Sequence, residues 1–162
     1  GMTLVWTILG AILITVVLAF CITFFIVRPR LAKKVNAGAT EVAKELHGRQ
    51  PLKSTAASCE GCSDPDRMAL KGVGVIALSE QALVFGSGAN GTTVVIPRSK
   101  VTEVGPATSI EILGRSIRRA RPMLLVRWND GKDVNQLIAF TIDDPLGWSA
   151  AIPLPTSPVD QG

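Results

Sequence analysis

The segment GVIALSEQALVF, residues 74–85, decides the fold of the C-terminal part of the chain. Glycine and apolar residues fill positions 72–78 and 82–85, and the polar tripeptide Ser79-Glu80-Gln81 separates the two runs. Short apolar runs bounded by turn residues are typical of β-strands. The segment therefore predicts two neighbouring strands.

The same pattern continues downstream and predicts five more strands, at 92–96, 101–104, 109–113, 123–128 and 136–142. Asn129-Asp130-Gly131 is a hairpin signal between the last two, because these residues tolerate positive φ. Asp143 or Asp144 can cap a final helix with Pro145 in its first turn. We expect its buried side to carry Leu146, Trp148 and Ile152. Residues 69–153 are thus predicted to form an all-β sandwich or barrel of about seven antiparallel strands, closed by one C-terminal helix.

Four motifs in this region carry a family resemblance: residues 74–85, VIPRSKVTEV at 95–104, MLLVRW at 123–128, and Ala139-Phe140 followed by DPLGW at 144–148. With them, residues 70–152 resemble the pleckstrin homology superfamily in its bacterial PH-like and GRAM-like forms. The resemblance implies the same strands and C-terminal helix, and it implies function only loosely, because such domains bind phosphoinositides or proteins. The first predicted hairpin lacks a Lys-x-Arg phosphoinositide motif, so we do not expect that activity.

A second decisive stretch lies near the N-terminus, where residues 4–27 contain no charged side chain. A helix needs about 20 apolar residues to cross the hydrocarbon core, so this stretch predicts a transmembrane helix. A cleaved signal peptide is the alternative, but it would have a basic region before a shorter apolar core. Cys21 ends a weak likeness to a lipoprotein box, in which Phe20 is too bulky.

Basic residues immediately follow the apolar stretch, namely Arg28, Arg30, Lys33 and Lys34. Because positive residues flank membrane helices on the cytoplasmic side, they predict an N-terminus outside and a C-terminal domain in the cytoplasm. We therefore expect a single-pass protein of the bacterial inner membrane. They also supply a surface for anionic lipid.

Small residues recur every fourth position along the predicted membrane helix, at Thr7, Ala11, Thr15, Ala19 and Thr23. Such a ridge lets helix backbones approach closely in lipid. It predicts docking against an integral membrane protein or a second copy of the chain. The alternative is that small residues, which are common in such helices, fall in this register by chance.

Between anchor and domain, residues 28–47 have apolar positions at helical spacing, including Leu31, Val35, Val42 and Leu46. They predict a short amphipathic helix that lies on headgroups, extends the anchor as a stalk or packs on a partner. Residues 48–68 are rich in Pro, Gly, Ser, Thr and Ala, and predict a linker. Residues 154–162 are expected to form a flexible tail.

The predicted linker contains Cys59 and Cys62 in a CxxC arrangement. One CxxC supplies only two of the four ligands of a closed zinc site, and His47 is the only histidine. These cysteines are therefore weak metal candidates. We expect reduced, inert thiols in a cytoplasmic loop and no cofactor.

The chain has a formal net charge of +4, and a run of arginines without an acid lies between two predicted strands. Arginine suits phosphate or carboxylate recognition, so this run is the best candidate surface for an anionic partner or lipid. A solvated loop is the alternative reading. The candidate residues are Arg115, Arg118, Arg119 and Arg121, joined by Arg98 and Lys100 if their loop folds nearby.

Other function classes fit the sequence poorly. Residues 86–91 match GxGxxG, but a strand is predicted after them, whereas a dinucleotide fingerprint opens a helix. No basic-aromatic motif favours nucleic acid. No catalytic arrangement of residues is evident, so we expect a non-enzyme. The first hypothesis is an adaptor or accessory subunit of a membrane protein complex, and the alternative is a module that binds anionic phospholipid.

Overall fold

The computed structural model describes residues 1–89, 91–132 and 134–153, and the chain divides into two compact units after Lys33. Asn90, Asp133 and the expected flexible tail at 154–162 lie outside the described residues. Each unit is described by itself. The N-terminal unit is helical and the C-terminal unit contains all the strands.

Residues Met2–Glu45 form one continuous helix. It consists of α1 (Met2–Ile22), the π-helical η1 (Thr23–Val27) and α2 (Arg28–Glu45). The N-terminal unit contains α1, η1 and the start of α2. Its most apolar window has a mean hydropathy of 2.8 and none of that window is buried. The wider turn of η1 ends two residues before Pro29, which has no amide hydrogen and whose ring would clash with the Phe25 carbonyl in a regular α-helix. The exposed apolar helix is compatible with a single membrane span or a signal sequence.

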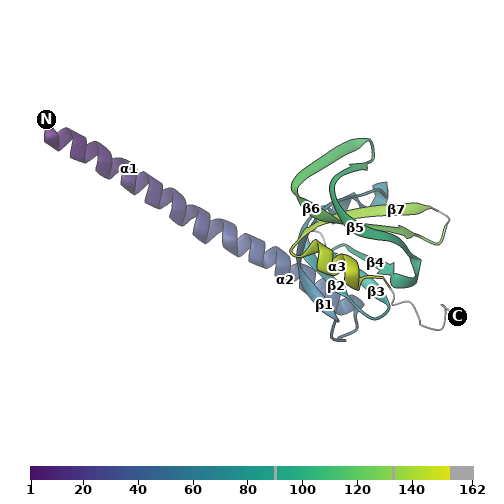
Figure 1. Cartoon of the computed structure of the whole chain (residues 1–162). Coiled ribbons are helices and arrows are strands. Elements are labelled where there is room, and N and C mark those ends of the chain that lie inside the picture. The colour runs from purple at the N-terminus through teal and green to yellow at the C-terminus, as the bar shows by residue number, and fades with distance from the viewer. Residues whose placement is uncertain (90, 133, 154–162) are drawn as a thin grey trace. The chain divides into compact units, whose positions relative to one another are not determined.

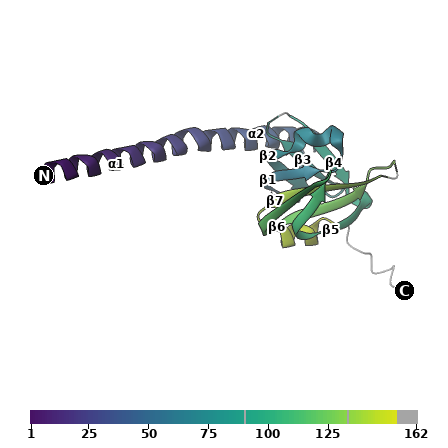
Figure 2. The same cartoon turned by 90° about the horizontal axis from the view of Figure 1, so that it is seen from above.

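The C-terminal unit is built on one antiparallel sheet of seven strands in the order β4-β3-β2-β1-β7-β6-β5 (Figures 1 and 2). This confirms the prediction of seven antiparallel strands followed by one C-terminal helix. The elements are β1 (Lys53–Cys62), η2 (Pro65–Leu70), β2 (Gly72–Leu78), β3 (Ala82–Ser87), β4 (Thr93–Pro97), η3 (Arg98–Lys100), β5 (Val101–Ile112), β6 (Arg115–Asn129), β7 (Asn135–Ile142) and α3 (Pro145–Ala151).

The predicted linker at 48–68 is wrong where it covers β1. Most residues of this strand are small and show no apolar alternation, but it pairs with β2 on one side and with β7 on the other. Neighbouring strands therefore satisfy its backbone hydrogen bonds and fix it in the sheet. The count of seven still holds because two predicted strands, 101–104 and 109–113, are the two ends of the single long β5.

Alternate residues of the strands build a large apolar core on the concave side of the sheet. In β2, Ile76 and Leu78 point into this core, while Val75 and Ala77 belong to a different cluster on the other face. Such alternation follows from the two-residue period of a strand. Apolar residues fill both faces, which explains why the strands appear as uninterrupted apolar runs in the sequence.

The end of α2 covers the outer face of β2 and β3. Val42 and Leu46 are buried in a cluster with Val75, Ala77 and Val84. The prediction of an amphipathic helix is confirmed, and its buried side packs on the chain's own sheet. Of the predicted apolar positions, Leu31 is instead exposed.

Glycines bring α2 and β3 together backbone to backbone. A Cβ atom on Gly38 would lie 2.6 Å from the Gly86 carbonyl oxygen, and one on Gly88 would overlap the Lys34 carbonyl. Two glycines of the GxGxxG match thus make room for a helix packed on the sheet. They do so at the end of a strand and not at the opening of a helix.

The C-terminal helix α3 begins as the sequence predicts. Asp144 adopts positive φ and its side chain accepts a hydrogen bond from the Gly147 amide at 3.1 Å. Trp148 and Ile152 are buried in the core. The expectation for Leu146 is wrong, since it is 67% exposed.

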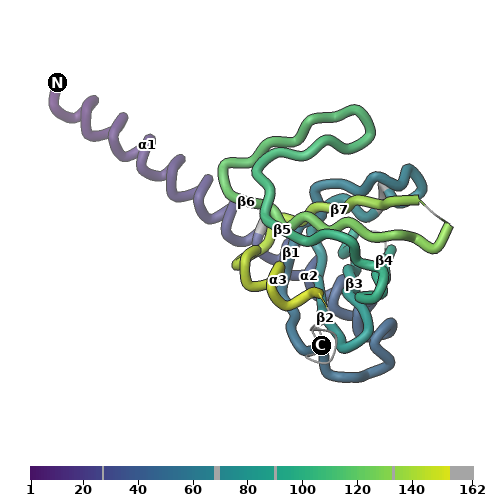
Figure 3. Tube along the Cα trace, turned by 45° about the vertical axis from the view of Figure 1, so that its right-hand side comes forward, coloured from purple at the N-terminus to yellow at the C-terminus, as the bar shows by residue number. Residues whose placement is uncertain are grey.

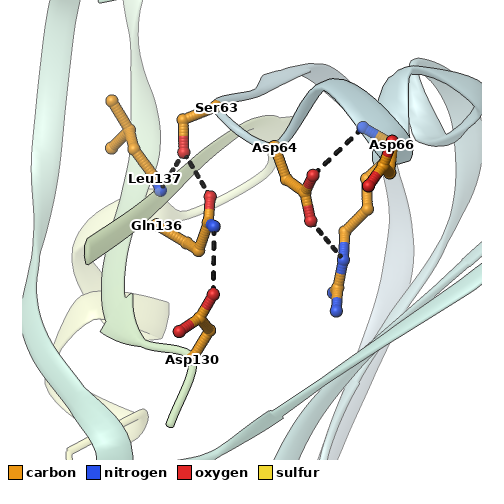
Figure 4. A network of polar contacts seen from close by, with 7 residues as sticks. Ser63, Asp64, Asp66, Asp130, Gln136 and Leu137 are labelled. Atoms are coloured by element: carbon orange, nitrogen blue, oxygen red, sulfur yellow. Dashed lines mark hydrogen bonds and ion pairs between the residues drawn. The ribbon is translucent and has the colours of Figure 1, made fainter. Parts of the chain in front are cut away.

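A polar network fastens the end of β1 to β7 (Figure 4). The Ser63 hydroxyl donates to Gln136 Oε1 and accepts from the Leu137 amide, both at 2.8 Å. Gln136 donates in turn to Asp130 at 3.2 Å. Hydrogen bonds from the Lys132 amide and from Gln136 lower the pKa of Asp130. This network links β1 to the turn between β6 and β7.

Candidate functional site

The four clustered arginines lie on the first half of β6, and not in a loop as the sequence suggested. The β5–β6 hairpin is longer than the strand beside it. β7 pairs only with residues 124–129 of β6, so the outer part of the hairpin has no β7 neighbour. Its outer part, residues 109–118, forms a two-stranded ribbon with the turn Leu113-Gly114 at its tip. Figure 3 shows this hairpin extending past its neighbouring strands. We call residues 109–121 the basic hairpin.

An interruption in the pairing places two of the arginines outside the ladder. Ala107 pairs with Met123 and Ser109 pairs with Arg118, so residues 119–122 have only Thr108 opposite them. A bulge of this kind bends a strand and redirects its side chains. Arg119 and Arg121 lie in this bulge and are exposed.

One of the arginines is tied to the sheet. Arg119 Nη2 lies 2.7 Å from Glu60 Oε2, and the other carboxylate oxygen of Glu60 accepts a hydrogen bond from Thr141 at 2.6 Å. Glu60 therefore has both oxygens engaged. Arg115, Arg118 and Arg121 are exposed and form no ion pair with any described residue.

The tip of the basic hairpin carries an exposed apolar side chain. Leu113 is 50% exposed and has φ of 51°, and Gly114 follows with φ of 75°. Two-residue turns with positive φ at both positions favour Asn-Gly, because a leucine side chain is disfavoured there. The chain thus presents a leucine beside Arg115 at a position where turn chemistry favours a polar residue.

A cavity of about 250 Å³ lies between the hairpin tip and the end of β1. A Cβ atom on Gly61 would lie 3.2 Å from Ile112 Cδ1, so the glycine lets the hairpin lie close over β1. We call this cavity the hairpin pocket. Its lining combines apolar side chains with two cations and one acid: Glu60, Gly61, Cys62, Lys71, Ile112, Leu113, Arg115 and Ile117.

Arg98 does not join this cationic surface. It is 8% exposed, and its guanidinium donates to backbone carbonyls at the end of α3 and in the turn between β2 and β3. The acceptors are Ile152 at 2.7 Å, Pro153 at 2.9 Å, Ala151 at 3.0 Å, Ser79 at 3.3 Å and Glu80 at 3.4 Å. Such carbonyl clamping is structural, so the expectation that Arg98 binds an anionic partner is wrong.

Lys100 is exposed but lies on another part of the domain, away from the basic hairpin. A Cβ atom on Gly131 would lie 2.9 Å from Lys100 Nζ, which puts this ammonium beside the turn between β6 and β7. That turn is at the other end of β6 from Arg115. Lys100 therefore does not extend the basic hairpin.

The two cysteines of the CxxC pair lie on β1 and not in a loop. Cys59 and Cys62 are 1% and 3% exposed and belong to the main core. Burial raises the pKa of the Cys59 thiol to about 12, and it also raises the pKa of Cys62. Because metals bind the thiolate, this environment disfavours a metal site. Within the described residues no group of three potential ligands surrounds them.

The N-terminal unit carries the predicted small-residue ridge on its surface. Thr7, Ala11, Thr15, Ala19 and Thr23 are all exposed. The three threonine hydroxyls donate to carbonyls one turn earlier, at 2.7–2.9 Å. They are thus satisfied without a partner helix. The flanking cations Arg28, Arg30, Lys33 and Lys34 are exposed too, with Arg28 over the Phe24 ring at 4.6 Å.

The sequence indicated the arginines but not the residues that line the hairpin pocket beside them. Glu60 and Lys71 lie far from the arginines along the chain, and only the pairing of β1 with β7 brings them close. Leu113 was assigned to a strand end. A sequence signal existed, because Leu113-Gly114 stands between two alternating runs, at a place where Asn-Gly is usual.

A larger cavity of about 570 Å³ lies between the end of α2 and β3–β4. Both acidic and basic side chains line it, including Glu45, His47, Arg49 and Glu80. It therefore favours no ligand charge. The hairpin pocket is the more selective of the two.

Comparison with protein-family models, with curated proteins and with solved structures finds no match for this chain. The fold and the site geometry therefore carry the functional argument.

Proposed function

We propose that this chain is a non-enzymatic, single-pass membrane protein whose cytoplasmic β-domain binds anionic phospholipid through the basic hairpin. One observation carries the proposal: Arg115, Arg118 and Arg121 are exposed, form no ion pair with any described residue and follow one another along the hairpin strand that begins beside the exposed Leu113. Cations beside an exposed apolar residue suit a bilayer surface, which offers phosphates outside and hydrocarbon beneath.

The expected magnitudes support a tethered contact. Each basic residue near an anionic membrane contributes about 1 kcal/mol, so three arginines contribute roughly 3 kcal/mol. Burying a leucine side chain adds about 1.5–3 kcal/mol. The isolated domain should thus bind weakly, whereas an anchor raises the effective concentration to about the millimolar range or above.

The resemblance to the pleckstrin homology superfamily is consistent with this proposal. Seven antiparallel strands and a C-terminal helix are what the resemblance implies for residues 70–152, and the domain has both, although its first strand starts at Lys53. Membership in the superfamily is part of the proposal. The basic hairpin would then be the surface through which this domain binds its ligand.

The same proposal assigns the membrane topology. Arg28, Arg30, Lys33 and Lys34 follow the apolar helix, and this distribution favours an N-terminus outside and a β-domain in the cytoplasm of the cell. A phosphatase reporter and a fluorescent-protein reporter fused after Gly162 test it. Fluorescence without phosphatase activity is expected, and the reverse would overturn the topology.

The second candidate function is an accessory subunit of a membrane protein complex. The exposed ridge from Thr7 to Thr23 favours it, because small residues permit close helix contact in lipid. Replacing Ala11, Thr15 and Ala19 by leucine should then abolish co-purification of a partner in mild detergent. Lipid binding by the β-domain should be unaffected by these changes.

Vesicle co-sedimentation of residues 34–162 tests the first candidate. This fragment contains every residue of the three apolar clusters, including β1. We expect binding to vesicles that contain phosphatidylglycerol and none to pure phosphatidylcholine. Replacing Arg118 and Arg121 by alanine should weaken binding roughly tenfold or more, because each arginine contributes about 1 kcal/mol.

A matched control is the double variant Arg127→Ala and Lys132→Ala, which removes two exposed cations away from the basic hairpin. It should bind like the wild-type fragment. Equal losses in both double variants would show that net charge alone is sensed, and would contradict a hairpin-directed contact. High salt should release the wild-type fragment, since exposed charges are screened.

A further inference from the structure

We infer that the hairpin pocket binds the phosphate group of a phosphomonoester. This inference rests on the proposed function, because the pocket lies beneath the tip of the same hairpin. It goes further by naming one built site and one ligand chemistry. The arginines of the proposed function contact a surface, whereas the pocket is a cavity of about 250 Å³ that can enclose a single group.

Charge selects an anion. Lys71 comes from the segment before β2, Arg115 comes from the start of β6, and both line the same cavity. Neither forms an ion pair with any residue in the described parts of the chain. Two cations held on one cavity without a counter-ion attract a dianion, and a phosphomonoester carries up to two negative charges near neutral pH.

The one acid of the pocket does not cancel this attraction. Glu60 lines the cavity, but Arg119 and Thr141 engage its two oxygens at 2.7 Å and 2.6 Å. With Arg119 counted, three cations stand against one carboxylate around the pocket. The local charge therefore remains positive where an anion would enter.

The apolar wall favours a phosphate attached to an apolar body. Ile112, Leu113 and Ile117 line the pocket opposite the polar groups, and Leu113 is half exposed at its rim. A free phosphate would contact only the cations, whereas a lipid phosphate would also cover these side chains. The shared chemistry is the phosphate, and the experiment separates its two sources.

Native mass spectrometry of the full chain in mild detergent tests the site. The probes are phosphatidic acid, inorganic phosphate and phosphatidylcholine, titrated onto wild type and onto the variants Lys71→Ala and Arg115→Ala. We expect one saturable molecule per chain of phosphatidic acid, of inorganic phosphate or of both, and none of phosphatidylcholine. Each variant should weaken binding about tenfold or more, because hydrogen bonds to charged groups are the strong ones.

Arg127→Ala and Lys132→Ala are the matched controls, since each removes an exposed cation that belongs neither to the basic hairpin nor to the lining of the pocket. Both should bind the phosphate probes like wild type. The inference is overturned if no phosphate probe saturates at one per chain, or if all four variants bind alike. Lys71 and Arg115 are exposed, and thermal unfolding should confirm that their variants keep the fold.

The two proposals can fail separately. Loss of vesicle binding in the Arg118 and Arg121 variants, with unchanged binding of inorganic phosphate, supports both the surface contact and the pocket. Saturable phosphate binding that depends on Lys71, together with absent binding to phosphatidylglycerol vesicles, would keep the pocket and reject the proposed function. Vesicle binding that ignores Lys71, with no saturable phosphate, would reject the pocket alone.

Discussion

Gly38 of α2 and Gly86 of β3 meet backbone to backbone: a Cβ atom on either glycine would lie 2.6 Å from the other's carbonyl oxygen. The contact is reciprocal, so neither position has room for a side chain. Gly74 adds to it, because its Cα lies 3.1 Å from a Cβ on Gly38. The helix α2 is therefore fastened to the sheet at a point where two glycine backbones meet.

Gly38→Ala should destabilise the β-domain. Alanine gains about 1 kcal/mol of helix propensity over glycine. Overpacking against backbone atoms, which cannot rotate away, typically costs about 1–3 kcal/mol. We expect a net loss of about 1 kcal/mol, and at most about 2 kcal/mol, in the free energy of unfolding of residues 34–162, measured with urea. Gly105→Ala is the control, since nothing lies within 4 Å of its Cβ position, and equal losses would contradict the close crossing.

Arg98→Ala should destabilise the same fragment more strongly. The buried guanidinium serves five backbone carbonyls, and its removal leaves the end of α3 without donors. An unsatisfied buried acceptor costs about 1–3 kcal/mol, so a loss of at least 3 kcal/mol is expected. Arg98→Lys should recover only part of it, because an ammonium lacks the planar fork.

Arg127→Ala is the control for this change. Arg127 is exposed and pairs with Glu103 at 3.1 Å, so its loss should cost less than about 1 kcal/mol. Urea unfolding of both variants compares the two arginines directly. Equal small effects would show that Arg98 does not clamp α3.

The sequence predicted those parts of the fold in which local chemistry and tertiary structure agree. β2 was found at 72–78 with correct bounds because both of its faces are buried and its residues are apolar throughout. The cap of α3 was found because Asp144 acts on the nearby Gly147 amide. β1 was missed because its small residues carry no β signal, and two neighbouring strands impose its conformation.

The candidate site was predictable only in its composition. The arginine run is visible in the sequence, but residue type alone does not distinguish a buried arginine such as Arg98 from an exposed one such as Arg118. Which of them faces solvent depends on where α3 ends. Likewise, Lys71 and Arg115 share a pocket only because the hairpin folds over β1 at Gly61.

Alkaline pH should destabilise the β-domain through Cys59. Burial raises the folded-state pKa of this thiol from 9.0 to about 12. Between these values the unfolded chain has lost the thiol proton while the folded chain keeps it, so stability falls as pH rises. The slope is about 1.4 kcal/mol per pH unit from this group.

Urea unfolding of residues 34–162 at several pH values above 9 measures this slope. Cys59→Ala removes the titrating group, and its stability should fall less steeply with pH by about that amount. In native protein at neutral pH, Ellman's reagent should leave Cys59 and Cys62 unlabelled, since both are buried. Rapid labelling of either thiol before unfolding would place it outside the core.

Leu113→Asn should raise stability and lower membrane binding at once. Leu113 and Gly114 both have positive φ, a conformation that disfavours leucine by about 1–2 kcal/mol and that Asn-Gly adopts readily. The variant should therefore unfold at higher urea concentration. It also loses the apolar side chain at the tip, and with it roughly 1.5–3 kcal/mol of burial in a bilayer.

The measurement is a pair of experiments on residues 34–162, urea unfolding and co-sedimentation with phosphatidylglycerol vesicles. Leu113→Met keeps an apolar side chain at the tip and should preserve vesicle binding. Leu146→Asn removes another exposed leucine, on α3, and should leave binding unchanged. A stabilised Leu113→Asn variant that binds vesicles as well as wild type would show that the leucine does not enter the membrane. A simultaneous gain of stability and loss of binding would show that the turn keeps a disfavoured residue because the hairpin contacts lipid.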